Sequence, residues 1–168
     1  MKIDIKDPGK ILDIASKLPP DVAKEFTKTY FKIQELDKKG NIQKDFMPFV
    51  KHVWPDFIEG SHHKRIGDIF NRIADGKLKR LIINMPPRHT KSEFASFLFP
   101  AWMVGRNPKL KIIQSTNTTE LSVRFGRKAK QLMDDPLYKE VFDTRLREDS
   151  QAAGKWETEQ GGEYYAAG

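Results

Sequence analysis

The stretch from Lys79 to Phe97, KRLIINMPPRHTKSEFASF, constrains the fold of this chain most strongly. Its β-branched run Leu81–Ile83 predicts a buried strand at the centre of a sheet. The pair Pro86-Pro87 ends any strand or helix, because neither residue has a backbone N–H group. Good helix formers and apolar residues resume after Lys91-Ser92. The order of strand, tight loop, Lys-Ser and helix predicts a phosphate-binding loop.

The loop differs from the regular pattern G-x-x-x-x-G-K-[ST] at both glycine positions, which Met85 and Thr90 occupy. Glycine serves there because the backbone approaches the phosphates closely and uses dihedral angles that a Cβ atom disfavours. In such a loop the lysine reaches the β- and γ-phosphates and the hydroxyl binds Mg²⁺. The alternative is a plain β-loop-α connection in which Lys91 is a solvated surface charge.

The net charge of +7 is concentrated in the part of the chain that carries this loop. Residues 64–130 have a net charge of +11, whereas residues 1–63 have +1 and residues 131–168 have −5. A basic block of this size indicates a polyanionic partner, either a nucleotide or a nucleic acid. A solvated basic surface is the alternative.

The length and composition indicate about one soluble globular domain. The 168 residues are 38% hydrophobic and 32% charged, with no apolar run long enough for a membrane span and no signal peptide. The absence of cysteine excludes disulfides and cysteine-based zinc sites or nucleophiles.

The apolar periodicity predicts an N-terminal helical segment over residues 1–44. We expect one helix over Gly9–Lys17 and a second from Asp21 to about Lys38, ended by Gly40. The second helix carries an amphipathic stripe that must pack on something, formed by Val22, Phe26, Tyr30, Ile33 and Leu36. The aromatic stretch of residues 45–60 is interpreted as a hydrophobic lid on the sheet, with stacking on a nucleotide base as the alternative.

Further elements follow on either side of the loop. We expect a helix over Lys64–Ala74, and the adjacent His62-His63 is a poor chelating pair because neighbouring helical side chains diverge. A second strand over Lys109–Ser115 would bury Ile112 and Ile113. A helix over Thr119–Met133 and a hairpin of Trp156–Thr158 with Glu163–Ala167 complete the prediction. Alternating strands and helices indicate a parallel sheet with right-handed crossovers.

Several phrases taken in order resemble the large subunit of tailed-bacteriophage terminases, the motors that pump DNA into procapsids. The run RLIINMPPRHTKSEFASFLFPAWMVGRNP is similar to the ATPase segment of that family, and IIQSTNTTELSVRFGRK, residues 142–150 and the W-x-T-x-x-G-G phrase from Trp156 extend the likeness. The resemblance implies an α/β fold with a RecA-like P-loop NTPase core and a parallel sheet. Residues 45–168 would be a partial ATPase domain, ending before a carboxylate-bearing strand and an RNase H-like nuclease domain.

The resemblance also implies roles for the loop residues. Lys91 and Arg88 would act in catalysis, with Arg88 either a finger on the transferred phosphoryl group or a solvated loop residue. Ser92 would bind Mg²⁺. The residues implied in nucleotide binding are Pro87, Arg88, His89, Thr90, Lys91 and Ser92. Arg124, Arg127 and Lys128 would contact DNA or a subunit. The alternative is that they form an ordinary solvated face of their helix.

The function implied for the full-length protein is ATP-driven DNA packaging followed by DNA cleavage. Double-stranded DNA, the phage portal and the small terminase subunit would be partners of a homo-oligomer in the host cytoplasm, with no membrane involved. We expect the 168 residues to bind ATP and Mg²⁺ without turnover, because they contain no apolar strand ending in a carboxylate pair. The alternatives are a helicase-like ATPase and a non-catalytic basic nucleic-acid-binding protein with a degenerate loop.

Overall fold

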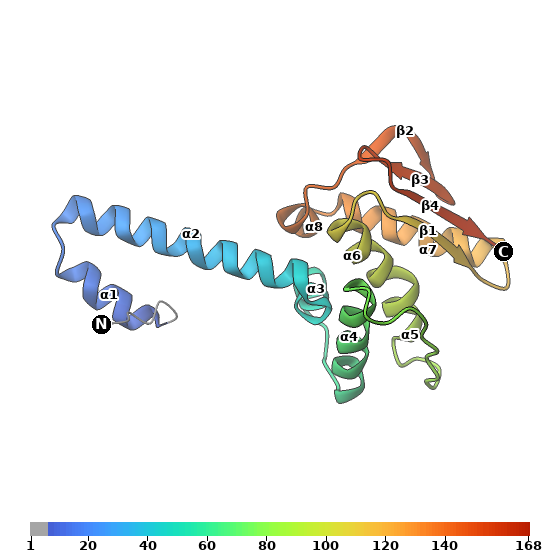
Figure 1. The fold of residues 1–168 in the computed structure, drawn as a ribbon, viewed down its shortest axis with the longest axis horizontal. Coiled ribbons are helices and arrows are strands. Elements are labelled where there is room, and N and C mark those ends of the chain that lie inside the picture. The colour runs from blue at the N-terminus through green and yellow to red at the C-terminus, as the bar shows by residue number, and fades with distance from the viewer. Residues whose placement is uncertain (1–6) are drawn as a thin grey trace. The chain divides into compact units, whose positions relative to one another are not determined.

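The protein has a mixed α/β fold, and its computed structural model describes residues 7–168 (Figure 1). The chain forms two compact units, residues 1–40 and residues 41–168. Among the described residues, no helix combines the length and apolar character that crossing a bilayer requires.

The described part of the first unit, residues 7–40, is helical, as predicted, and residues 1–6 of the predicted helical segment lie outside the described residues. Helix α1 (Pro8–Ser16) begins after Asp7, whose carboxylate accepts a hydrogen bond from the Gly9 N–H at 3.0 Å. Helix α2 (Pro20–Lys44) does not end at Gly40 and instead runs on into the second unit. A Cβ atom at Gly40 would meet nothing within 4 Å, and the residue is half-buried inside the helix, so this glycine is an ordinary helical position. The expectation that Gly40 ends the helix is therefore wrong.

The apolar stripe on α2 is mostly exposed rather than packed. Tyr30 is buried at 6% exposure, whereas Val22, Ile33 and Leu36 are 50%, 41% and 59% exposed. The periodicity therefore predicted the helix correctly but not its burial.

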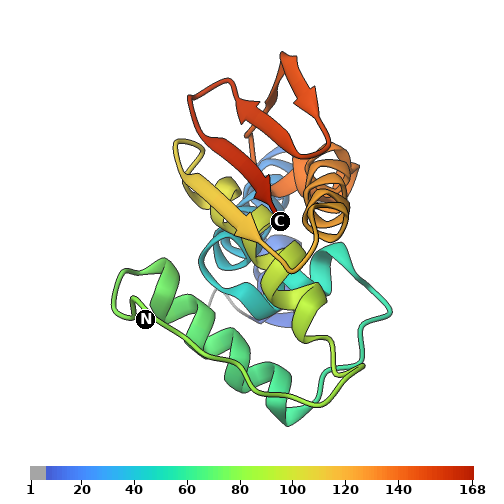
Figure 2. The ribbon, with the colours of Figure 1, turned by 90° about the vertical axis from the view of Figure 1, so that its right-hand side faces the viewer.

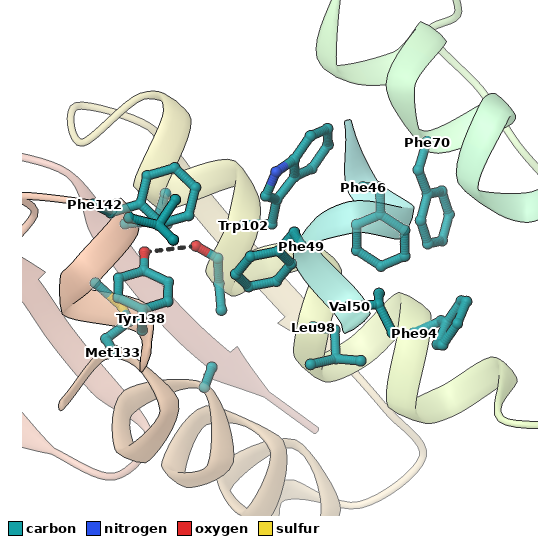
Figure 3. Packing of buried hydrophobic residues seen from close by; sticks show 14 of the residues in the cluster. Phe46, Phe49, Val50, Phe70, Phe94, Leu98, Trp102, Met133, Tyr138 and Phe142 are labelled. Atoms are coloured by element: carbon teal, nitrogen blue, oxygen red, sulfur yellow. Dashed lines mark hydrogen bonds between the residues drawn. The ribbon is translucent and has the colours of Figure 1, made fainter. Parts of the chain in front are cut away.

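Helix α3 (Phe46–Val53) lies at the centre of the core of the second unit (Figure 3). The Phe46 ring makes edge contacts with Phe70, Phe94 and Trp102 at centroid distances of 5.0, 5.3 and 5.5 Å. Phe70 belongs to α4 (Ser61–Ala74), which begins three residues earlier than the sequence indicated. The most buried aromatic residues of the 45–60 stretch, Phe46 and Phe49, are therefore core residues with no surface left for a nucleotide base.

The remaining core elements come from the C-terminal half. Tyr138, on α8 (Pro136–Val141), donates a hydrogen bond from its buried hydroxyl to the Ala101 carbonyl at 2.9 Å. Ala129 and Met133 of α7 (Thr119–Asp134) pack into the same cluster. The structure confirms α7 at nearly its predicted length, and Asp135 separates it from α8 by capping the second helix.

The sheet has the strand order β1-β4-β3-β2. Its strands are β1 (Lys111–Ser115), β2 (Leu146–Ala152), β3 (Lys155–Thr158) and β4 (Glu163–Ala167). Strand β1 pairs with β4 in parallel, and the other two pairs are antiparallel. The strand predicted over Lys109–Ser115 and the predicted hairpin are thus confirmed. The all-parallel sheet is not. Ile113 was expected to be buried, but it is 77% exposed because side chains alternate along β1.

The predicted central strand Leu81–Ile83 is absent. This segment is an irregular connection between α4 and the next helix, and Figure 2 draws it without an arrow. Its burial alternates, with Leu81 and Ile83 packed against the core and Ile82 87% exposed. The side chains therefore follow a strand-like period, but no described strand pairs with the segment. The expectation of a buried central strand is wrong for this structure.

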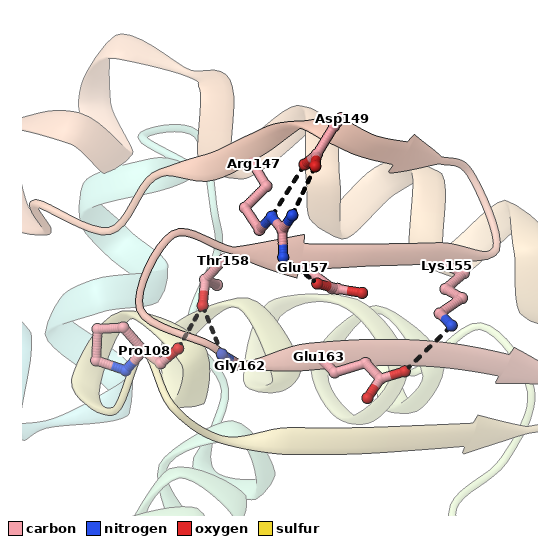
Figure 4. A network of polar contacts seen from close by, with 8 residues as sticks. All are labelled: Pro108, Arg147, Asp149, Lys155, Glu157, Thr158, Gly162 and Glu163. Atoms are coloured by element: carbon pink, nitrogen blue, oxygen red, sulfur yellow. Dashed lines mark hydrogen bonds and ion pairs between the residues drawn. The ribbon is translucent and has the colours of Figure 1, made fainter.

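The W-x-T-x-x-G-G phrase holds the sheet to the turn before β1 (Figure 4). The buried Thr158 hydroxyl donates to the Pro108 carbonyl at 2.5 Å and accepts from the Gly162 N–H at 2.8 Å. A Cβ atom at Gly162 would collide with the Pro108 carbonyl, and Gly161 has a φ of 91°. Trp156 stacks on Tyr164 with ring centroids 4.7 Å apart. These residues of the phrase therefore have structural roles.

Candidate nucleotide-binding loop

The candidate loop ends at a long helical run that begins at Lys91. The run comprises α5 (Lys91–Glu93), a π-helical turn η1 (Phe94–Leu98) and α6 (Phe99–Arg106). Pro100 has no N–H group to donate to the preceding turn, which accounts for the widened turn next to it. The first backbone bond runs from the Phe94 N–H to the Thr90 carbonyl at 2.9 Å. The N–H groups at the start of the helix therefore have no helical acceptor.

The loop backbone adopts left-handed conformations at two residues that are not glycine. Arg88 has a φ of 64°, and Thr90 has φ 60° and ψ 3°. Such angles cost a β-branched residue on the order of 1–3 kcal/mol, and glycine adopts them freely. The regular pattern has a glycine directly before its lysine. In this chain that position is Thr90, and its backbone is left-handed. A left-handed residue next to helical ones turns successive N–H groups toward one side, as in anion-binding nests.

The Lys91 side chain folds back across the loop. Its Nζ atom donates a hydrogen bond to the Met85 carbonyl at 2.9 Å, so the two ends of the loop are joined through this ammonium group. In the part of the chain that the structure describes, no carboxylate forms an ion pair with Lys91. The positive charge is consequently held by a neutral carbonyl and remains available to an anion.

The other predicted loop residues lie at the surface. Pro87, Arg88, His89 and Ser92 are exposed, and Thr90 is half-buried. His89 is held within the loop, since its Nδ1 lies 2.9 Å from the Pro87 carbonyl. The six predicted residues therefore form one continuous stretch at the surface, in which Thr90 and Lys91 are half-buried and the other four are exposed.

A contact that the sequence did not predict lies beneath this turn. His63, from the first turn of α4, has its Nε2 atom 2.8 Å from the Thr90 hydroxyl. The two residues are separated by 27 positions, and no spacing rule relates a helix start to a loop that far along the chain.

The three predicted DNA contacts on α7 fall into two environments. Arg124 and Arg127 are exposed and line a pocket of about 630 Å³ together with Glu120 and other residues from the start of α7 and the loop before it. Lys128 instead forms an ion pair with Glu93, with Nζ 2.8 and 2.9 Å from the two carboxylate oxygens. Its ammonium also lies 5.4 Å from the centre of the Phe97 ring. Lys128 therefore joins α7 to the helical run that follows the loop.

The loop has the donor set for a nucleotide phosphate chain and one hydroxyl for a metal ion. Within residues 7–168, no group of three His, Cys, Asp or Glu side chains could hold a metal ion. Mg²⁺ in nucleotide sites is held largely by phosphates and water with few protein ligands, so a single Ser92 hydroxyl is compatible with it.

Comparison of the chain with known protein families, with curated proteins and with solved structures returned no match.

Proposed function

We propose that residues 85–92 bind the phosphate chain of ATP with Mg²⁺, in the ATPase core of a terminase large subunit with a RecA-like fold. The observation that carries the proposal is the Lys91 ammonium group, which spans the loop to the Met85 carbonyl without a carboxylate partner. The left-handed Thr90 supports it, because its backbone has the conformation for which the regular loop uses glycine. The order of the sequence phrases supplies the terminase part of the proposal.

The residues would divide the work of binding as follows. Lys91 would leave the Met85 carbonyl and bind the β- and γ-phosphates, while the free N–H groups at the helix start would donate to phosphate oxygens. The exposed Ser92 hydroxyl would bind Mg²⁺, which neutralises phosphate charge during phosphoryl transfer. Arg88 is close enough along the chain to contribute a second positive charge at the same turn. In the packaging motor, duplex DNA, the portal and the small subunit would be the partners.

A second candidate is a non-catalytic nucleic-acid-binding module. It is favoured by Arg124 and Arg127, which line the pocket on α7 and, among the described residues, have no acidic partner. This candidate requires no nucleotide in the loop, so nucleotide binding separates the two.

The test is calorimetric titration of ATP with Mg²⁺ into the 168-residue chain and into Lys91→Ala. We expect Lys91→Ala to weaken binding at least about tenfold, which corresponds to roughly 1.4 kcal/mol. Lys109→Ala is the matched control, because it removes the same charge from an exposed position outside the loop. Equal affinities of the wild type and Lys91→Ala would rule out the nucleotide loop and favour the second candidate.

A further inference from the structure

His63 is a buried titratable side chain that the proposed nucleotide chemistry does not use directly. It is 7% exposed and lies between aromatic rings, with the Phe57 and Phe94 ring centres 4.8 and 5.3 Å from its own. Buried imidazoles need partners for both nitrogens, and both partners are present here.

The hydrogen bonds of His63 define its tautomer. The Gly60 N–H donates to Nδ1 at 2.9 Å, so Nδ1 carries no proton. Nε2 therefore carries the proton and donates it to the Thr90 hydroxyl oxygen at 2.8 Å. That hydroxyl in turn donates to the His89 carbonyl at 2.7 Å. A directed chain thus runs from the N-cap of α4 through His63 into the backbone of the loop.

We propose that His63 is a positioning residue for the nucleotide loop: its neutral Nε2–H form holds Thr90 in the left-handed conformation that the loop needs where glycine is absent. This inference rests on the proposed nucleotide site. A glycine would need no such support, whereas a threonine with φ 60° is strained and the hydrogen bond from His63 offsets part of that strain. Thr90 and His63 together thus maintain the left-handed backbone that a glycine would adopt without support.

The surroundings of His63 favour its neutral form. Burial lowers the pKa of His63 below 6.5, and the neighbouring His62 and His89 lower it further, whereas Glu59 raises it. Protonation would leave the Nε2–H donor to Thr90 in place but would put a proton on Nδ1 and break the bond from the Gly60 N–H, so the ring would lose the contact that orients it toward Thr90. Because the pKa of His63 is lower in the folded state than in the unfolded chain, neutral His63 stabilises the fold fully above pH 6.5. This stabilisation is lost as the pH falls through the folded-state pKa.

The first experiment is a double-mutant cycle on ATP binding at pH 8. We expect His63→Leu to weaken ATP binding roughly three- to tenfold in the wild type and to have no effect in Thr90→Gly, where no strain remains. Thr90→Ala should weaken binding to a similar degree, because it keeps the strain and loses the hydroxyl. Thr90→Ser is the matched control, since it keeps the hydroxyl and should bind like the wild type.

The second experiment compares the pH profiles of ATP binding for the wild type and His63→Gln, whose amide can donate to Thr90 but does not titrate. ATP and every other side chain are the same in both measurements, so the ratio of affinities isolates His63. We expect the wild type to lose affinity relative to His63→Gln as the pH falls from 8 to 5. A constant ratio overturns the proposal.

The outcomes distinguish this inference from the function beneath it. If Lys91→Ala binds ATP as well as the wild type, the nucleotide site is wrong and this inference fails with it. If Lys91→Ala weakens binding but His63→Leu has the same effect in the wild type and in Thr90→Gly, only the inference fails.

Long-range ¹⁵N correlation spectra give an independent measurement of the His63 tautomer that needs no nucleotide. A protonated Nε2 on His63 supports the proposal, and a protonated Nδ1 overturns it.

Discussion

Thr90 combines a conformation suited to glycine with a branched side chain, which makes it the most informative single residue of the chain. Its φ of 60° is tolerated because His63 and the His89 carbonyl bind its hydroxyl. The sequence predicted that a Cβ atom would be unfavourable at this position. It could not predict the compensating histidine, because that contact depends on how α4 packs against the loop.

Replacing Thr90 with glycine should increase the affinity for ATP. The substitution removes the strain of the left-handed conformation but also removes the hydroxyl that His63 binds, so we expect a gain of up to about tenfold, or roughly 1.4 kcal/mol. Calorimetry with ATP and Mg²⁺ measures it directly. Weaker binding by Thr90→Gly would mean that the threonine hydroxyl itself contacts the nucleotide.

The basic residues of α7 should differ in their effect on DNA binding. Duplex DNA should bind weakly and without sequence preference, with an affinity that falls steeply as salt rises. Replacing Arg124 and Arg127 with Ala should reduce the salt slope by about two, whereas Lys128→Ala should change it less because Glu93 already neutralises that charge. Filter binding at several salt concentrations is the measurement. Equal effects of the three single substitutions would contradict this division.

At the scale of elements, helices with a clear apolar period and one hairpin with a glycine turn were predictable, whereas the pairing of strands that are distant in sequence was not. The period identified α2, α4 and α7, and the Gly161-Gly162 turn identified the β3–β4 hairpin. Strand β2 was missed because Arg147, Glu148 and Asp149 give it the composition of a solvated loop, and α8 because it has only six residues. The apolar run Leu81–Ile83 was assigned as a strand because sequence shows an apolar pattern but not whether another strand lies beside it.

The Thr158 contact should contribute measurably to the stability of the sheet. Thr158→Val keeps the shape but removes both hydrogen bonds, which leaves the Pro108 carbonyl and the Gly162 N–H without this partner. We expect a loss of about 1–3 kcal/mol in the free energy of unfolding. Urea denaturation measures it, with Thr158→Ser as the control that retains the hydroxyl. A loss of equal size in both variants would show that packing of the methyl group is responsible instead.

At the scale of the whole molecule, the candidate site draws on elements that are distant in sequence. Helix α4 supplies His63, the loop would supply the donors to the phosphates in the proposed function, and α7 contacts the loop helix through Lys128 and Glu93. The sequence predicted the loop residues as a set because they are contiguous. The contacts that join the loop to α4 and α7 are tertiary, so the one-dimensional pattern did not contain them.

The 168-residue chain should bind ATP without hydrolysing it above background. Hydrolysis requires a carboxylate that orients or activates the attacking water, and the sequence contains no apolar strand ending in a carboxylate pair. A coupled phosphate-release assay on the chain and on Lys91→Ala measures turnover. Hydrolysis that Lys91→Ala abolishes would mean that another carboxylate of this chain performs that step.

The unpaired segment Leu81–Ile83 has a consequence for how this molecule exchanges protons with water. Amide protons that no backbone acceptor holds exchange with deuterium on a timescale set by chemistry rather than by unfolding. The amides of this segment should therefore label within seconds, although the Leu81 and Ile83 side chains pack against a core whose helices label far more slowly. A stretch of chain that is anchored by its side chains but open along its backbone can still accept a strand along that edge.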